Sequence, residues 1–295
     1  MRDYRNLRRS LTATVGSFAL LLSACGGDDE AATTAAPEAR NGQSAGDEPV
    51  NGSTLSEIEA RPVHSETLAY ADVDERLVYG HFASPSDMIE PLPAVIVVHD
   101  WWGLNDDTRD AANQLASYGY MVLAIDLYGG DVVDDIDAAR RKRIPVIENP
   151  QHVESNVRQA LQFLEFAGTP KTAVLGWGFG GRWSLNAAMW FPEDVDAAVV
   201  YYGQVTNDDE VLQLIEGPVL GLFGRRDRSV TSETVSAFEE AMQRIGKDVT
   251  IHTYPDAGHA FADPARPTFD AETTADAWRR TAEFLATALA PDEEE

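Results

Sequence analysis

A glycine-rich turn, an aspartate and a histidine are the residues of this chain whose types and spacing could support catalysis. The turn, Gly176 to Gly181, reads Gly-Trp-Gly-Phe-Gly-Gly and lies between an apolar run and a helical pattern. Glycines at this spacing can cradle the phosphates of a dinucleotide. A turn between a strand and a helix can also present a catalytic nucleophile at its middle residue, which here is Gly178. Asp227 and His259 follow in the order of an orienting acid and a general base.

The dinucleotide interpretation needs an acidic residue at the end of the next strand, where the carboxylate would bind the ribose hydroxyls. The acids that follow the turn, Glu193, Asp194 and Asp196, precede the next predicted strand, which ends at Tyr201-Tyr202. The turn also falls in the middle of the sheet rather than in its first strand–helix unit. A dinucleotide-binding protein is therefore the weaker hypothesis, and we expect neither a cofactor nor a metal.

Alternating strand and helix patterns must position these residues. Continuous apolar runs predict buried strands at 94–98, 121–125, 172–175, 197–202, 219–223 and 249–254. An antiparallel pair is predicted before them, at 66–73 and 76–82. This alternation indicates one doubly wound, mostly parallel α/β sheet flanked by helices, in a single domain. Asp227 and His259 lie on the loops that follow the last two strands.

Five segments, in order, resemble a known family. They are His99-Asp100-Trp101-Trp102-Gly103-Leu104-Asn105 after the strand 94–98, Asp126-Leu127-Tyr128-Gly129-Gly130, the glycine-rich turn, Gly224-Arg225-Arg226-Asp227, and Gly258-His259-Ala260-Phe261. Together they are similar to the dienelactone hydrolase family of α/β-hydrolases, over about residues 66 to 289. The resemblance implies an α/β-hydrolase fold. It also implies hydrolysis of lactones and other carboxylic esters through a covalent acyl-enzyme, usually formed on a cysteine.

The resemblance further implies roles for individual residues. Gly178 stands where the nucleophilic cysteine of the family would be, so this position offers no attacking atom. Asp227 would orient His259, which could then act as a base on water instead of on a thiol. The backbone N–H groups of Trp101 and Phe179 resemble the oxyanion hole of the family and need no particular side chain.

Around this centre we expect a pocket that includes Asp100, Trp102, Tyr128 and Trp177. Asp100 matches an acid that interacts with the nucleophile in the family. Asp263 stands where a family arginine would bind the substrate carboxylate, which argues against a dianionic dienelactone as the ligand. Two functions remain open. One is slow, water-mediated hydrolysis of a small ester or lactone, and the other is ligand binding without catalysis.

The N-terminus predicts export and lipid anchoring. Four arginines precede an apolar run, Val15 to Leu22, that is too short to span a bilayer. Leu22-Ser23-Ala24-Cys25 resembles a bacterial lipobox, which implies that Cys25 is lipidated and becomes the first residue of the mature protein. An ordinary secretory signal is the alternative. Cys25 is the only cysteine of the chain, so no thiol remains for catalysis. We expect the protein on the extracytoplasmic face of a membrane.

These patterns divide the chain into four parts. They are a lipoprotein signal peptide at 1–25, a disordered acidic tether at 26–62, a dienelactone hydrolase-like domain at 63–290 and an acidic tail at 291–295. A formal net charge of −26 repels phosphate backbones, so we expect no nucleic-acid partner. The expected partners are a small-molecule ester or lactone and the membrane. The sequence leaves the oligomeric state open.

Overall fold

The computed structural model describes residues 60–291. The predicted signal peptide, the predicted tether up to residue 59 and residues 292–295 of the acidic tail lie outside the described residues. Within residues 60–291, eight strands form one sheet. They are β1 (Val63–Val73), β2 (Arg76–Pro85), β3 (Ala94–Val98), β4 (Met121–Ile125), β5 (Thr172–Trp177), β6 (Ala197–Tyr201), β7 (Val219–Gly224) and β8 (Val249–Tyr254).

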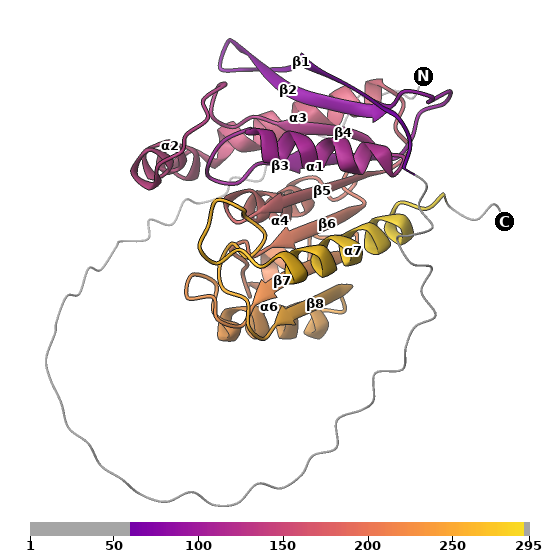
Figure 1. Cartoon of the computed structure of the whole chain (residues 1–295). Coiled ribbons are helices and arrows are strands. Elements are labelled where there is room, and N and C mark those ends of the chain that lie inside the picture. Colours follow the sequence, from indigo (N-terminus) through magenta and orange to yellow (C-terminus); the bar gives the residue numbers. More distant parts are fainter. Residues whose placement is uncertain (1–59, 292–295) are drawn as a thin grey trace, which may run out of the picture. The chain divides into compact units, whose positions relative to one another are not determined.

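The strands lie side by side in the order β1-β2-β4-β3-β5-β6-β7-β8 (Figure 1). β1 pairs with β2, and β2 with β4, in antiparallel fashion, whereas the remaining pairs are parallel. All five residues of β3 are buried, as is usual for an apolar strand covered on both faces. The predicted doubly wound, mostly parallel sheet with an antiparallel opening pair is confirmed.

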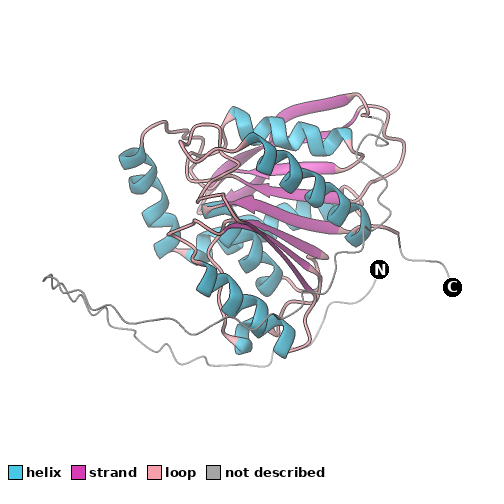
Figure 2. Ribbon diagram, turned by 60° about the horizontal axis from the view of Figure 1, so that its bottom comes forward, coloured by secondary structure: helices cyan, strands magenta, loops and turns pink. Residues whose placement is uncertain are grey.

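Helices cover both faces of the sheet (Figure 2). The helices are α1 (Asp106–Ser117), α2 (Ile136–Glu148), α3 (Pro150–Phe166), α4 (Phe179–Trp190), α5 (Asp209–Leu212), α6 (Ser232–Arg244) and α7 (Ala271–Ala288). Side chains of α1 and α7 pack against one face, and side chains of α3, α4 and α6 pack against the other. No helix between residues 60 and 291 combines the length and the apolar character that a membrane crossing requires.

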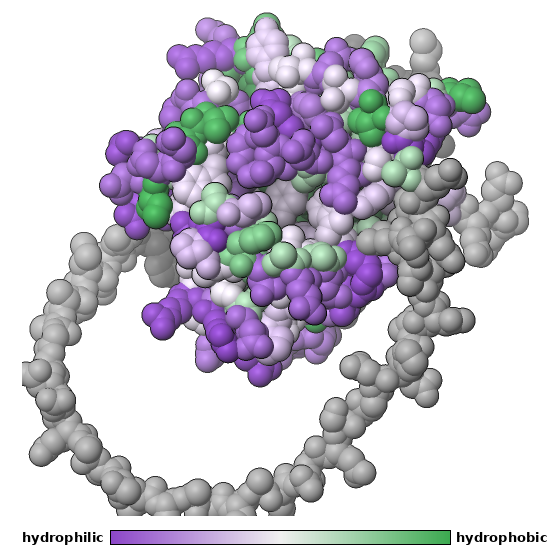
Figure 3. Space-filling model, in the orientation of Figure 1, coloured by the Kyte–Doolittle hydropathy of each residue, from purple (hydrophilic) through white to green (hydrophobic). Residues whose placement is uncertain are grey.

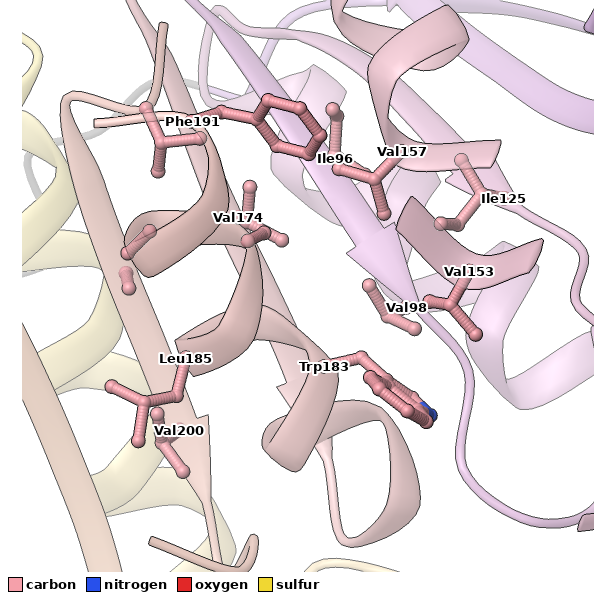
Figure 4. Close-up of a cluster of buried hydrophobic side chains, with 14 of the residues drawn as sticks. Ile96, Val98, Ile125, Val153, Val157, Val174, Trp183, Leu185, Phe191 and Val200 are labelled. Carbon is pink, nitrogen blue, oxygen red and sulfur yellow. The ribbon is translucent and has the colours of Figure 1, made fainter. Parts of the chain in front are cut away.

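Two layers of apolar side chains fix the sheet between its helices. Successive side chains of a strand point to opposite faces. Ile96 and Val98 of β3 therefore join the cluster that includes α3 and α4, while Val95 and Val97 join the cluster that includes α1 and α7. Figure 4 shows the first cluster, in which the ring of Trp183 from α4 lies near Val98. The strand ends, and the loops that start from them, are held by this packing.

The starts of α2 and α3 can be compared with what the sequence predicts. The segment from Asp131 to Arg143 is acidic and then basic, a pattern that predicts a solvated helix over these residues. Instead, α2 begins at Ile136, because the carboxylate of Asp135 accepts a hydrogen bond from the backbone N–H of Ala138. The helix then continues through Pro145. The pair Asn149-Pro150 predicts a helix cap followed by proline at the first helical position. Pro150 does open α3, yet the side chain of Asn149 makes no capping hydrogen bond. The predicted start of α2 is therefore wrong, whereas Asn149 does occupy the N-cap position of α3 but caps the helix without its side chain.

Candidate active site

Only one residue of the glycine-rich turn, Gly178, lies outside both the strand and the helix. β5 continues through Trp177 and α4 begins at Phe179, which leaves Gly178 alone between strand and helix. Gly178 has φ 49° and ψ −105°. A residue with a side chain would hold this conformation at a cost of about 1–3 kcal/mol. The backbone N–H of Gly178 donates to the carbonyl oxygen of Tyr201 at 2.9 Å, so β6 helps to hold the turn.

The neighbouring glycines allow a close approach between α4 and the sheet. A Cβ on Gly176 would lie 2.4 Å from the backbone of Gly180, and a Cβ on Gly180 would lie 2.2 Å from the carbonyl oxygen of Val98. Both distances are far below any ordinary carbon contact, so a side chain would push α4 away from β3 and β5. The spacing of these glycines is thus explained by helix–strand packing and needs no bound dinucleotide.

Asp227 and His259 form a hydrogen-bonded pair. Asp227 follows β7, His259 follows β8, and Asp227 Oδ2 lies 2.8 Å from His259 Nδ1. Asp227 Oδ1 accepts hydrogen bonds from the backbone N–H groups of Ser229 at 2.6 Å and Val230 at 3.0 Å. The buried carboxylate is therefore fixed on one side by the loop and on the other by the imidazole. When Nδ1 of His259 donates to Asp227, Nε2 is left as the basic nitrogen.

Two residues next to the imidazole of His259 have strained backbone conformations. The side chain of His259 is 34% exposed, and the ring of Tyr202 meets it edge-on with 5.4 Å between the ring centroids. Tyr202 has φ 38° and Ala260 has φ 60°, values that favour glycine. Each such residue costs of the order of 1–3 kcal/mol, and strain of this kind gathers at functional sites. Sequence patterns give no signal for these two conformations.

Asp100 occupies the position where the sequence predicted an oxyanion hole. Its Oδ1 accepts hydrogen bonds from the backbone N–H groups of Trp101 at 2.7 Å and Phe179 at 3.2 Å. These are the two groups that were expected to bind an oxyanion. A Cβ on Gly178 would lie 2.7 Å from the same Oδ1. The carboxylate of Asp100 therefore fills the space beside Gly178 and uses both backbone donors.

Burial makes the carboxyl group of Asp100 a weaker acid than an ordinary aspartate. Burial raises its pKa to about 6, although the hydrogen bonds from the N–H groups of Trp101 and Phe179 lower the pKa. The charge of Asp263 raises the pKa further, and the charge of His259 lowers it. Asp100 is consequently ionised at neutral pH and becomes protonated in mildly acidic solution.

A buried histidine that the sequence did not single out holds the Asp100 loop. His99 is fully buried, its Nδ1 lies 2.6 Å from the carbonyl oxygen of Asp100, and its Nε2 accepts the backbone N–H of Leu127 at 3.1 Å. The carboxylate of Asp126 accepts the backbone N–H groups of Tyr128 and Gly130. His99 thus connects the loops that follow β3 and β4. Its place directly after an apolar strand was the available signal.

A cavity of about 580 Å³ opens beside this centre, between α1 and α7. Asp100, Trp102 and Trp177 line it, as the sequence predicted. Tyr128 was also expected in the pocket, but it does not line this cavity. Its ring packs instead against His99 and Phe179, with centroid separations of 4.8 Å and 5.7 Å.

Comparisons with known proteins agree with this architecture. The family model for the "Dienelactone hydrolase family" matches residues 78–289. A Yersinia pestis protein provisionally named as a carboxymethylenebutenolidase is 30% identical over 247 residues, which are 78% of this chain and 91% of the relative. A relative of the same name from Methylorubrum extorquens is 31% identical over 211 residues, 66% of this chain and 72% of that protein.

A solved structure shows the same arrangement. The crystal structure of a protein from Klebsiella pneumoniae, provisionally named as a dienelactone hydrolase, superposes with a TM-score of 0.70 at 25% sequence identity. The superposition covers 77% of this chain and 99% of the Klebsiella protein. The sheet order, the loops that carry Asp227 and His259 and the family match over residues 78–289 lead to one conclusion: this chain belongs to the dienelactone hydrolase family.

Proposed function

We propose that this protein hydrolyses small carboxylic esters or lactones by activating water directly, without a covalent acyl-enzyme. The observation that carries this proposal is the Asp227–His259 pair, whose 2.8 Å hydrogen bond supplies an oriented base, while Gly178 supplies no nucleophile. Membership of the family supports hydrolase chemistry, and the names of the relatives support a lactone or ester as the substrate class.

The proposed reaction uses only the substrate, one water molecule and groups of the protein. His259 Nε2 removes a proton from water while the water oxygen attacks the carbonyl carbon. The carbonyl oxygen becomes an oxyanion, which accepts the N–H groups of Trp101 and Phe179 once the carboxylate of Asp100 withdraws from them. The tetrahedral intermediate then collapses, the C–O bond to the alcohol breaks, and protonated His259 returns its proton to the leaving alkoxide.

Two features support slow turnover. Enzymes of this mechanistic type that lose the nucleophile retain only about 10³–10⁴-fold acceleration over the reaction in water, from the oxyanion donors and substrate binding. In this protein those donors already bind Asp100. The same observation favours a second candidate function, a ligand-binding protein without catalysis. If Asp100 keeps both N–H groups permanently, no donor is left to stabilise an oxyanion.

Replacing His259 with alanine separates these two functions. If His259 is the base for water, we expect the rate of p-nitrophenyl acetate hydrolysis to fall about 100-fold, within the range that general base catalysis contributes. His64→Ala is the matched control, because this exposed histidine lies on β1 and outside the site. Equal, background-level rates for wild type and His259→Ala would contradict the hydrolase proposal and leave the binding protein.

We also propose that the protein is exported and held at the extracytoplasmic face of a membrane by lipid on Cys25. The basic residues, the short apolar run and Leu22-Ser23-Ala24-Cys25 support this proposal. Cells supplied with radiolabelled palmitate should incorporate the label into the wild-type protein, whereas Cys25→Ser should remove nearly all of it, because no other cysteine is present. Equal labelling of the two proteins would disprove the anchor at Cys25.

A further inference from the structure

The cavity between α1 and α7 has the size of a site for a small organic ligand. Its volume of about 580 Å³ falls within the range of about 300–1,000 Å³ that is common for such sites. Residues of α1 form one side and residues of α7 the other, with the ends of β5 and β6 at its base. Figure 3 shows this face of the molecule, which is hollowed between the two helices and has hydrophilic side chains beside the hollow.

Four carboxylates and no basic side chain line the cavity in the described part of the chain. The acids are Asp100, Asp107, Asp110 and Asp263. The guanidinium groups of Arg143 and Arg266 lie over the ring of Trp101, which is not part of the cavity wall. The pKa of Asp107 is raised by burial and by the charges of Asp263, Asp110 and Asp106. The carboxylates therefore repel one another in a shared concave space.

Asp263 is the most informative of these acids. It is only 9% exposed, and its side chain is fixed by hydrogen bonds rather than by a cation. Oδ2 accepts the indole N–H of Trp102 at 2.8 Å, and Oδ1 accepts the backbone N–H of Ala265 at 2.8 Å. Buried carboxylates are normally paired with a positive charge. The described residues place no such charge in the cavity wall, so none of the lining side chains can neutralise Asp263.

Aromatic rings form much of the rest of the cavity wall and are a second feature of the cavity besides its acids. They include Trp102, Tyr118, Trp177, Tyr202, Phe269 and Trp278. The rings of Trp177 and Trp278 are nearly parallel, with 6.5 Å between centroids and 12° between planes. The indole N–H of Trp278 donates to the hydroxyl of Tyr118 at 3.1 Å, which holds the ring in place. Aromatic faces attract organic cations because the ring quadrupole places negative potential there.

We infer that this cavity binds the cationic part of a small organic ligand, such as a quaternary ammonium group with an apolar body. The carboxylates supply the charge preference, and the rings supply contact surface that a strongly hydrated metal ion could not use. No group of three or more His, Cys, Asp or Glu side chains within residues 60–291 is arranged to hold a metal. Because Asp100 lines both the cavity and the site of the proposed hydrolysis, the inference names esters of amino alcohols as the substrates and rests on the proposed function for that step.

The binding test compares two probes of equal shape, choline and its neutral analogue 3,3-dimethylbutan-1-ol, by calorimetry on the mature full-length protein in detergent. We expect choline to bind about 10-fold more tightly, as a cation–π contact together with nearby carboxylates would provide. Equal affinities for the two probes would overturn the inference.

Substitutions of residues in the cavity wall test which side chains cause the preference for choline. Asp107→Asn with Asp110→Asn should weaken choline binding about 10-fold and leave the neutral analogue unchanged, and Trp278→Leu should also weaken choline binding. Asp134→Asn with Asp137→Asn is the matched control, because it removes the same net charge outside the cavity. A loss of choline binding in the control equal to that in the cavity variant would show a non-specific charge effect and overturn the inference.

A hydrolysis test distinguishes failure of the inference from failure of the proposed function. Butyrylcholine and 3,3-dimethylbutyl butyrate present the same acyl group and differ only in charge. If both are hydrolysed with equal KM, the cation preference is wrong while the hydrolase stands. If choline binds selectively but neither ester is hydrolysed above background, the cation site stands and the proposed hydrolysis, with its amino-alcohol substrates, is wrong.

Discussion

Replacing Gly178 with cysteine is expected to raise the rate of aryl-ester hydrolysis about 10³-fold over wild type. The substitution would place a thiol at the end of β5, where the Asp227–His259 pair can activate it. The sulfur would attack the ester carbonyl carbon, release the alcohol and leave a thioester that water hydrolyses with His259 as the base. The expected gain is smaller than the roughly 10⁶-fold contribution of the nucleophile in an intact triad, because the surroundings of position 178 are not built for a side chain.

Two costs accompany this gain. The φ of 49° at position 178 is strained for cysteine, by about 1–3 kcal/mol. The new Cβ would also lie 2.7 Å from Oδ1 of Asp100, so the end of that side chain must move. Movement of Asp100 frees the N–H groups of Trp101 and Phe179 for an oxyanion, which favours catalysis. The variant should therefore be less stable than wild type and more active.

Gly178→Ala is the control for this experiment, because it carries the same backbone strain and displaces Asp100 without a thiol. Rates on p-nitrophenyl acetate and the mass of the protein during turnover are the two measurements. We expect an acetyl adduct and an initial burst only for Gly178→Cys. Should cysteine and alanine give the same rate with no adduct, Gly178 would not be the nucleophile position of this protein.

Replacing Asp100 with asparagine is expected to increase the free energy of unfolding by about 3 kcal/mol at pH 7 and by much less at pH 4. Burial raises the folded-state pKa of Asp100 from 3.8 to about 6. Between these values the folded state retains a proton that the unfolded state releases. Stability therefore falls as the pH rises through this window and levels off above pH 6. Asparagine stays neutral, and its amide oxygen can still accept both N–H groups.

Urea unfolding at several pH values measures this difference. The gap between Asp100→Asn and wild type should open between about pH 4 and pH 6 and remain constant above that range. Asp134→Asn is the control, because this exposed carboxylate lies outside the site and its loss should leave the pH dependence of wild type unchanged. A gap of the same size at pH 4 and pH 7 would mean that Asp100 does not titrate in this window.

The sequence was sufficient to predict the fold and the relative placement of Asp227 and His259. Apolar runs such as 94–98 and 219–223 mark buried strands, and parallel strands place their following loops at one edge of the sheet. Two residues that are 32 positions apart could therefore be expected to meet, and the structure joins them by a hydrogen bond. The roles assigned to them in catalysis remain predictions.

The occupied oxyanion position and the acidic cavity could not be predicted in this way. The contact of Asp100 with the N–H of Phe179 depends on the conformations of two loops and on one side-chain rotamer. The four cavity acids come from the loop after β3, from α1 and from the loop before α7, and no local pattern reports that these segments meet. Likewise, Tyr128 follows a strand end as Asp100 does, yet its ring turns into the core beside Phe179.

The contact between Gly178 and Asp100 also constrains how this protein could change by mutation. A side chain at position 178 is disfavoured by about 1–3 kcal/mol while it displaces a buried charge, whereas neutralising Asp100 removes a similar amount of instability at neutral pH. The two positions are therefore epistatic. A lineage that first loses the charge of Asp100 could accept a nucleophile at position 178 without falling in stability, while the reverse order passes through a weakened intermediate.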